Sequence, residues 1–315
     1  MKKIMALMLC IIFATFSGCN YTDFLPTDFF LPQDTSSEET QNGEEPFVDI
    51  QSEVYDYCYN QLNKTQKNMY NKILGAMRNM QTDRVFLTYD GTDISENINL
   101  AYTAVSVDHP EIFWTSREYQ IYTLNNEEFY ISIKYDIDET TRDAQVAALE
   151  ARVEKLLAQT EGMSDFEKEV FFHDYLCNNI VYTSDGVDTR YTAFGAIVNG
   201  KAVCEGYSRA MQLLCKRAGI NCSLIKGTAE TVAHMWNVVE LSGKWYELDV
   251  TWDDLETDTP RYKYFNLTSN EMSSDHIRYV EIKGTGSGVS LKGSKYNLNP
   301  PDCTATEYNA EKINQ

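Results

Sequence analysis

Three stretches of the sequence decide the fold of this chain: VCEGYSRAMQLLCKRAGI (203–220), HMWNVVEL (234–241) and KWYELDVTWDD (244–254). They contain, in chain order, a thiol at Cys204, an imidazole at His234 and a carboxylate at Asp249. A cysteine, a histidine and an acidic residue that lie far apart in sequence can meet in one site of a folded protein. We therefore take these three residues as the candidate catalytic group.

The first stretch predicts a helix that begins at Cys204. From 205 to 218 the apolar residues recur at spacings of three and four, which is the helical period, and Gly219 suits the position after a helix end. At the helix N-terminus, unpaired backbone amides and the helix dipole favour a negative sulfur. We expect Glu205 to point outward, because its charge opposes a thiolate, and Gly206 to let a substrate backbone approach closely.

The second and third stretches predict a hairpin that brings His234 near Asp249. The apolar runs 235–241 and 245–250 flank Ser242-Gly243, a pair that suits a tight turn, and another strand is predicted before them. With a two-residue turn, His234 and Asp249 project from the same face as diagonal neighbours. The carboxylate can then orient the imidazole while the other ring nitrogen faces the sulfur.

Motifs around these residues resemble the transglutaminase-like superfamily of papain-related cysteine enzymes: GKAVCEG (200–206), HMWN (234–237) and LDVTW (248–252). The resemblance covers roughly residues 141–283 and extends to further segments: HDYL (173–176), NNIVY (178–182) and YKYFNLTSNEMSSDH (262–276). The segment DHPEIFW (108–114) is similar to an upstream domain that secreted bacterial members carry.

This resemblance implies an α+β fold with a papain-like transglutaminase core. The helix that bears Cys204 would pack on an antiparallel sheet that bears His234 and Asp249, and a smaller α+β module would precede this core. Cys204 is implied as the nucleophile, His234 as the general base and acid, and Asp249 as the orienting carboxylate. Acyl transfer would pass through a thioester.

An oxyanion in this site needs hydrogen-bond donors, of which the backbone amide of Cys204 is one expected member. The second donor stays open: Tyr182 and Tyr191 lie in the stretch upstream of the cysteine, where Phe194 cannot donate.

The acyl acceptor is not fixed by the resemblance, because members of the superfamily crosslink glutamine to amines, cleave peptides, remove glycans or are inactive. We expect hydrolysis of amide bonds in protein or peptide substrates, since transfer to an amine requires a site that excludes water. The alternatives are protein-glutamine amine transfer and a catalytically silent surface lipoprotein that binds a protein.

Other candidate residues favour structural roles. His173 and Cys177 lie four apart on a predicted helix at 164–179, so they share a face. They could be half of a metal site or a second nucleophile pair, but no third ligand is evident, and core packing is the preferred interpretation. His109 and His276 are each expected in a turn with a structural role. We expect no metal and no cofactor, and the sequence contains no phosphate-binding glycine loop.

The N-terminus predicts where the protein acts. Lys2 and Lys3 precede an apolar run at 4–16, and Ser17-Gly18 then precede Cys19. This pattern indicates a signal peptide of the lipoprotein type with Cys19 as the acylated residue, although cleavage elsewhere is an alternative. We therefore expect an extracytoplasmic protein that a lipid anchor holds on the membrane at the bacterial cell surface.

We expect five segments along the chain: a signal peptide (1–18), a flexible acidic tether (19–46), an N-terminal α+β module (47–140), a transglutaminase-like catalytic domain (141–283) and a C-terminal surface extension (284–315). The module is predicted to contain two helices (65–81 and 94–107) and a hairpin (118–124 and 129–135) that turns at Asn125-Asn126. It could place substrate, cover a cleft or serve only packing. A long helix at 140–160 leads into the catalytic domain.

Composition is typical of a globular protein, with 43% apolar and 12% aromatic residues among 315. Removing residues 1–18 takes away two lysines and no acids, which moves the net charge from −20 to −22. Nucleic acid is therefore not an expected partner, because phosphate binding needs a basic surface. The same charge favours neutral or basic protein substrates. The sequence gives no indication of the oligomeric state.

Eight cysteines are present, of which Cys10 leaves with the signal peptide. Apart from Cys19 and Cys204, five remain: Cys58, Cys177, Cys215, Cys222 and Cys303. An odd number argues against a complete disulfide framework, although Cys215 and Cys222 could pair.

Overall fold

The computed structural model describes residues 56–88, 94–124, 128–184, 188–254, 261–278, 298 and 300–314. The predicted signal peptide, the tether with Cys19, the Asn125-Asn126 turn and most of the chain from 284 to 299 lie outside these residues. Within the described parts, no helix has both the length and the apolar character that crossing a membrane requires.

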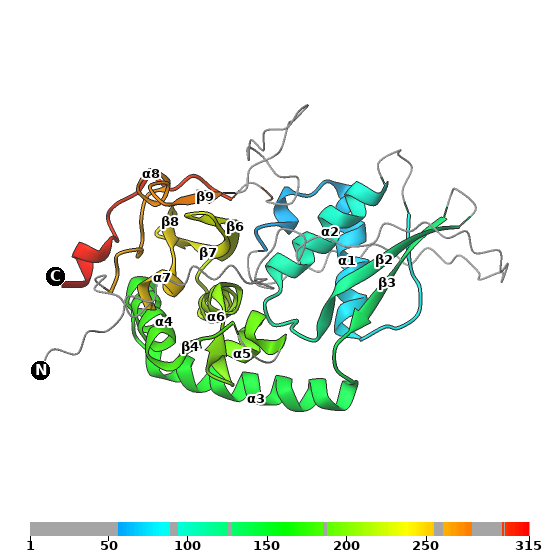
Figure 1. The fold of residues 1–315 in the computed structure, drawn as a ribbon, viewed down its shortest axis with the longest axis horizontal. Helices are drawn as coiled ribbons and strands as arrows, with labels where there is room; N and C mark the ends of the chain where they lie inside the picture. The colour runs from blue at the N-terminus through cyan, green and yellow to red at the C-terminus, as the bar shows by residue number, and fades with distance from the viewer. Residues whose placement is uncertain are drawn as a thin grey trace, which may run out of the picture.

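The described chain is an α+β structure whose two halves are joined by one long helix (Figure 1). The first half contains η2 (Tyr59–Gln61), α1 (Lys64–Arg78), β1 (Val85–Leu87), α2 (Ile94–Asp108), β2 (Thr115–Leu124) and β3 (Glu128–Tyr135). Its strands form an antiparallel sheet in the order β1-β3-β2. Both predicted helices and the predicted hairpin are therefore found, and β1 is an addition that the sequence pattern did not reveal.

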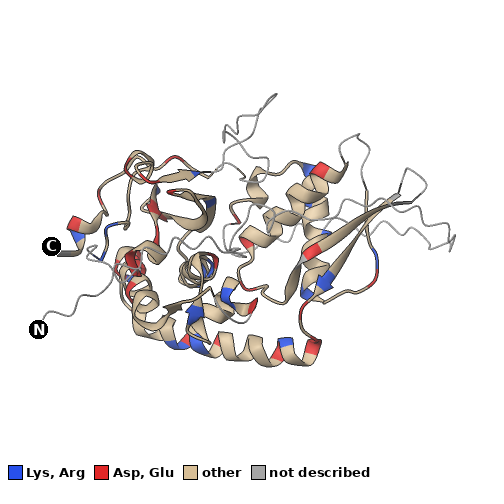
Figure 2. Cartoon of the chain, viewed as in Figure 1, with Lys and Arg blue, Asp and Glu red and all other residues tan. Residues whose placement is uncertain are grey.

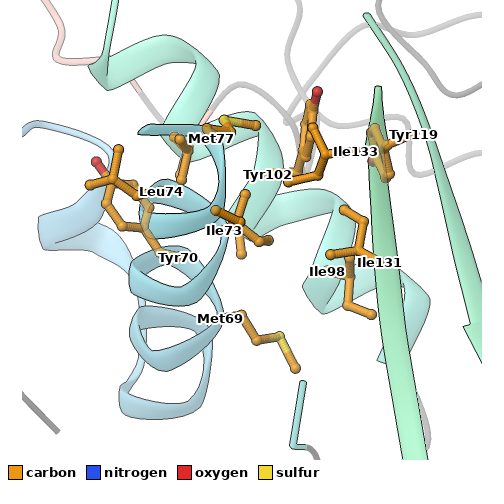
Figure 3. Packing of buried hydrophobic residues seen from close by; sticks show 14 of the residues in the cluster. Met69, Tyr70, Ile73, Leu74, Met77, Ile98, Tyr102, Tyr119, Ile131 and Ile133 are labelled. Atoms are coloured by element: carbon orange, nitrogen blue, oxygen red, sulfur yellow. The ribbon is translucent and has the colours of Figure 1, made fainter. Parts of the chain in front are cut away.

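The core of this first half lies between the two helices and the sheet (Figure 3). From α1, Met69 and Ile73 point toward α2 and the strands, and both are fully buried. On the sheet side, the ring of Tyr119 from β2 stacks on Tyr102 from α2 with centroids 3.9 Å apart. The apolar face of each helix thus finds its partner within this half.

Helix α3 (Glu139–Leu157) runs along the base of the view in Figure 1 beneath both halves. Val146 in its first part packs against the core of the first half, whereas Leu149 and Val153 belong to the core of the second half. Acidic and basic residues follow one another along the rest of its surface (Figure 2). One amphipathic helix is therefore shared by the two cores.

The second half contains the following elements: η3 (Ala158–Thr160), α4 (Asp165–Asn179), β4 (Val181–Tyr182), η4 (Asp188–Tyr191), α5 (Ala193–Ile197), β5 (Lys201–Ala202), α6 (Cys204–Arg217), β6 (Cys222–Ala229), β7 (Val232–Leu241), β8 (Lys244–Leu248), α7 (Val250–Asp254), α8 (Ser269–Met272), β9 (His276–Arg278) and η5 (Ala310–Asn314). Strands β8-β7-β6-β9 form an antiparallel sheet, and α6 packs on it (Figure 1). The helix that bears Cys204 thus lies on the sheet that bears His234, as predicted.

Two sequence expectations differ from the structure in this half. The run 245–250 is not a strand throughout: β8 ends at Leu248, and Val250 begins α7. The C-terminal segment is not confined to the surface, since Cys303 is only 1% exposed and joins the core beside Trp236 and Tyr264. Its backbone is fixed there by a hydrogen bond from Ser269 N to the Cys303 carbonyl.

The two halves are held together by polar side chains of α6. Residues on one face of α6 donate to the last carbonyls of α2: Arg209 to Ser106 O at 2.7 Å, Gln212 to Val107 O at 2.8 Å, and Lys216 to Asp108 O. The last carbonyls of a helix have no partner within the helix, so α6 satisfies groups that would otherwise be buried without one. The first half is thereby fixed on the helix that carries Cys204.

A buried carboxyl joins α4 to the C-terminal segment. Glu169 is fully buried, and Asn266 Nδ2 donates both to Glu169 Oε2 at 2.8 Å and to Tyr308 O at 3.0 Å. Burial raises the pKa of Glu169 from 4.5 to about 8, and the Asn266 hydrogen bond only partly opposes this. Glu169 is therefore a neutral acid in the folded protein at pH 7.

We predict that Glu169→Gln makes the protein less sensitive to alkaline pH. The pKa of Glu169 is higher in the folded state than in the unfolded state. Its contribution to the free energy of unfolding is therefore fully present below pH 4.5 and is lost as the pH rises toward 8. The variant should differ little from the wild type at pH 5 and exceed its melting temperature by about 10 °C at pH 8.5, since a rise in pKa from 4.5 to about 8 corresponds to a free energy on the order of 4 kcal/mol. Thermal denaturation at both pH values measures this, with the exposed Glu154→Gln as control. An equal difference at both pH values would refute the assignment.

Candidate functional site

His234 and Asp249 are brought together by the β7–β8 hairpin. Leu241 pairs with Lys244, and the two-residue turn between them has positive φ at Ser242 (51°) and Gly243 (76°), as a tight hairpin turn requires. His234 Nε2 lies 2.7 Å from Asp249 Oδ2. The register expected from the sequence is therefore found, and the imidazole and carboxylate are in direct contact.

Asp249 accepts four N–H groups. Its Oδ1 lies 3.0 Å from the Thr251 amide and 3.3 Å from the Trp252 amide, so it caps α7, while its Oδ2 accepts from two imidazoles. Capping by the Asp249 side chain explains why helix α7, and not a longer β8, follows this residue. Burial opposes ionisation, but the charges and hydrogen bonds of His234 and His276 outweigh it and hold the pKa of Asp249 below its usual range.

The second imidazole belongs to His276, for which we expected a structural role in a turn. His276 instead begins strand β9, is 2% exposed, and places Nε2 3.0 Å from Asp249 Oδ2. Its pairing with Ala229 of β6 puts it on the same face of the sheet as His234. A three-residue strand is too short for periodicity to reveal, so the sequence offered only the adjacent Asp275-His276 pair as a signal.

Cys204 is the first residue of α6 and is 2% exposed. Ser208, one turn later, places its hydroxyl oxygen 2.9 Å from the Cys204 carbonyl and 2.8 Å from the carbonyl of Met235. Met235 directly follows His234 on β7. The first turn of α6 is therefore fixed against β7 at the position of the histidine, as an interaction between the three candidate residues requires.

Two expectations for the residues after Cys204 are wrong. Glu205 does not point outward: it is 3% exposed and pairs with Arg209 at 2.9 Å, because the first half of the chain covers this face of α6. Gly206 does not leave room for a substrate. A Cβ at Gly206 would lie 2.4 Å from the carbonyl oxygen of Arg190, so the chain's own backbone fills this space.

The candidates for a second oxyanion donor lie in different surroundings. Tyr182 on β4 pairs with Ala202, two residues before Cys204, and is 47% exposed. The hydroxyl of Tyr191 accepts a hydrogen bond from Arg190 at 2.8 Å. Phe194 is buried and packs against Phe113. Backbone contacts thus bring two of these positions close to Cys204: Tyr182 pairs with Ala202, and the carbonyl of Arg190, directly before Tyr191, accepts from Val203 N at 3.0 Å.

His173 and Cys177 form a buried polar group apart from the candidate site. His173 Nε2 lies 3.2 Å from Asp253 Oδ2 and 3.8 Å from Cys177 Sγ, while its Nδ1 lies 3.1 Å from Asp174. Burial lowers the pKa of His173, but hydrogen bonds to the two carboxylates outweigh it, so that the pKa is raised. Both ring nitrogens are engaged, which fits the packing role favoured by the sequence rather than metal binding.

Among the described residues, one group has the ligand types and proximity to hold a metal ion: the donor atoms of His234, Asp249 and His276 lie within 4.8 Å of one another. The two nitrogen–oxygen distances, 2.7 and 3.0 Å, are hydrogen-bond distances. Ligands around a tetrahedral zinc ion lie roughly 3.3 Å apart, given bonds of about 2.0 Å. We therefore assign these contacts as hydrogen bonds.

No disulfide joins the six cysteines in the described parts of the chain. Cys215 and Cys222, which we considered as a pair, are joined by a hydrogen bond between their side chains. This hydrogen bond and burial raise the pKa of Cys215, so it is an unreactive thiol in the core.

Trp236 fills the space beside both imidazoles of the candidate site. Its ring lies 6.0 Å from the His234 ring and 5.0 Å from the His276 ring, and its Nε1 donates to Glu247 at 2.7 Å. Gly227, which pairs with His234 across the sheet, makes room for this ring. A Cβ at Gly227 would come within 2.5 Å of the indole and 2.2 Å of a backbone carbonyl oxygen on β9.

The fold and this site define an α+β protein with a cysteine at the start of a helix and a histidine–carboxylate pair on the adjoining sheet. Residues 152–250 match the Transglutaminase-like superfamily. Kyphoscoliosis peptidase is similar over 120 residues, with 25% identity for the Mus musculus protein and 24% for the Homo sapiens protein. The aligned part is 33% of this chain and 18% of each relative, so the chain spans less than a fifth of their length.

A crystal structure of a TGase is 14% identical, with 68% of this chain and 62% of that chain covered and a TM-score of 0.34. The family match covers α6, β7 and β8 and contains all three candidate residues. The chain thus carries a transglutaminase-like core.

We predict that Gly227→Ala disrupts the candidate site by steric conflict. The added methyl group meets the β9 backbone and the Trp236 ring, so the unfolding free energy should fall by at least about 2 kcal/mol. Urea denaturation measures this change. Gly75→Ala on α1 is the matched control, because its Cβ meets no atom within 4 Å and should stabilise the protein by about 0.5–1 kcal/mol. If Gly227→Ala has the same unfolding free energy as the wild type, the sheet can accommodate the added methyl group and the predicted steric conflict is wrong.

Proposed function

We propose that Cys204, His234 and Asp249 form the active site of a thiol enzyme that hydrolyses amide bonds in proteins or peptides. The observation that carries the proposal is the 2.7 Å contact between His234 Nε2 and Asp249, on a strand that the first turn of the Cys204 helix adjoins. An imidazole oriented by a carboxylate is one part of what activation of a cysteine by a histidine requires.

The chemistry follows from the hydrogen bond. Because Asp249 is an ionised acceptor, Nε2 of His234 carries the proton of that contact, and Nδ1 is left to exchange a proton with the thiol. The Cys204 thiolate attacks the amide carbonyl, the C–N bond breaks, and His234 gives its proton to the leaving amine. Water then attacks the thioester with His234 as base, which releases the acid and restores the thiol.

The start of α6 supports the negative charges of this reaction. Cys204 is the first helical residue, and amides of the first helical turn have no partner within the helix. The helix dipole favours a thiolate here, and the backbone amide of Cys204 is the proposed donor to the oxyanion. Glu205 does not oppose this charge, because Arg209 pairs with it.

The place of action is proposed from the sequence. A lipoprotein signal with Cys19 as the acylated residue would hold the enzyme at the outer side of a bacterial membrane, with residues 19–46 as the tether. The net charge of −20 favours encounters with neutral or basic substrates.

We predict that turnover depends on the Cys204 thiol. Wild-type protein is incubated with a mixture of unfolded proteins and a labelled primary amine, and products are identified by mass spectrometry. New chain ends with the mass of added water are expected, and Cys204→Ala should lose this activity by at least 10³-fold. Cys303→Ala serves as control, because burial raises the pKa of Cys303 to about 12 and makes it unreactive.

The other outcomes of this experiment separate the remaining functions. Incorporation of the labelled amine without new chain ends would replace hydrolysis by amine transfer. Equal turnover by Cys204→Ala, or protein binding without turnover by the wild type, would contradict the proposed enzyme.

A further inference from the structure

His276 is a second imidazole on the carboxylate that holds His234. Its Nε2 lies 3.0 Å from Asp249 Oδ2, the same oxygen that His234 contacts, and its Nδ1 lies 2.6 Å from Asp275 Oδ1. A continuous row of polar contacts thus runs from Asp275 through His276 and Asp249 to His234. The side chain of His276 is fully buried.

The contacts determine where protons lie on the two imidazoles. His276 has a carboxylate at each ring nitrogen, and a carboxylate only accepts, so both nitrogens must carry hydrogen. The ring is then an imidazolium. Among the described residues, His234 meets a carboxylate at Nε2 and not at Nδ1, which leaves Nδ1 to gain or lose a proton. Of the two histidines that contact Asp249 Oδ2, His276 therefore stays protonated, whereas His234 can exchange a proton at Nδ1.

The groups that face His276 support its positive charge. Trp236 and Trp252 contact its ring from β7 and α7, and Tyr264 contacts it from the loop before α8. The Tyr264 hydroxyl donates to Asp275 Oδ2 at 2.8 Å, which fixes that carboxylate. Among the described residues, the ionisable groups that face the ring are Asp249, Asp275, Tyr264 and His234.

Taken together, the groups around His276 favour the protonated form of its ring. Burial alone lowers the pKa of His276, but the hydrogen bonds and charges of Asp249 and Asp275 outweigh burial, so its pKa is raised. Further charges nearby are already paired: Arg278 of β9 binds Glu247 at 2.6 Å, and Asp253 binds His173.

We propose that His276 is a positioning residue that remains protonated, fixes Asp249 and offsets its charge, so that His234 is oriented by a hydrogen bond yet stays able to exchange its proton with Cys204. This inference deepens the proposed function and rests on it. Without His276, an unbalanced carboxylate would hold the proton on His234 more strongly. With His276 included, the proposed catalytic centre comprises four side chains: Cys204, His234, Asp249 and His276.

Nuclear magnetic resonance of the imidazole nitrogens tests this arrangement without any substrate. The chain has only four histidines, and single His→Gln variants assign their signals. Both nitrogens of His276 should carry hydrogen at pH 7 in the wild type. Asp275→Asn removes one of the two carboxylates, so His276 should lose its proton at a lower pH in this variant than in the wild type. A wild-type His276 that is neutral at pH 7 would overturn the proposal.

The effect on His234 separates a positioning role from a structural one. Gln at position 276 keeps an N–H donor but removes the charge, and the imidazole rings of the two histidines lie 5.5 Å apart. In His276→Gln, the pH midpoint for proton loss from His234 should rise by at least ~0.5 pH unit. An unchanged midpoint in a folded variant would mean that His276 only packs.

Failure of the proposed function would look different. If the protein has no hydrolytic activity, the imidazole nitrogen signals should still be as predicted, because they require only the folded protein. If turnover is found, the alkaline limb of its pH profile should move upward with the His234 midpoint in His276→Gln. A profile that does not move would contradict the positioning role even in an active enzyme.

Discussion

The carboxylate of Asp249 is the group on which the rest of the site depends. It ends β8, caps α7 through two backbone amides and accepts from two imidazoles. A buried carboxylate is stable only when such donors replace its water. Because the donors come from β7, β9 and α7, one side chain fixes three elements relative to one another. Loss of its charge would therefore alter the position of His234 as well as its protonation.

Helix α6 connects this site to the rest of the chain. Its first residue is Cys204, its first turn adjoins β7 through Ser208, and its polar face caps α2. The first half of the chain is thus fixed on the helix that carries the thiol. The first half also covers Glu205 and Arg209. The guanidinium of Arg209 pairs with the carboxylate of Glu205, the residue that directly follows Cys204. This contact gives the first half an electrostatic role in addition to packing.

The local parts of this arrangement could be predicted from the sequence. The period of α6 and the two-residue turn at Ser242-Gly243 are set by neighbouring residues. They placed Cys204 on α6 and His234 on β7 and brought Asp249 beside His234, although Asp249 follows β8 and does not lie on it. The contacts that were missed are non-local. His276 reaches Asp249 only because β9 pairs with β6, nearly fifty residues earlier in the chain, and Gly206 is filled by a distant backbone carbonyl. No local pattern encodes such contacts.

The most direct test of the central claim is the rate of alkylation of Cys204 against pH, followed by peptide mass mapping, in the wild type and in His234→Ala. A free cysteine titrates near pH 8.5. An activated pair predicts a midpoint well below that value in the wild type and a higher midpoint in His234→Ala. A midpoint near or above 8.5 that the substitution does not change would contradict the account and leave a binding protein with the fold of an enzyme.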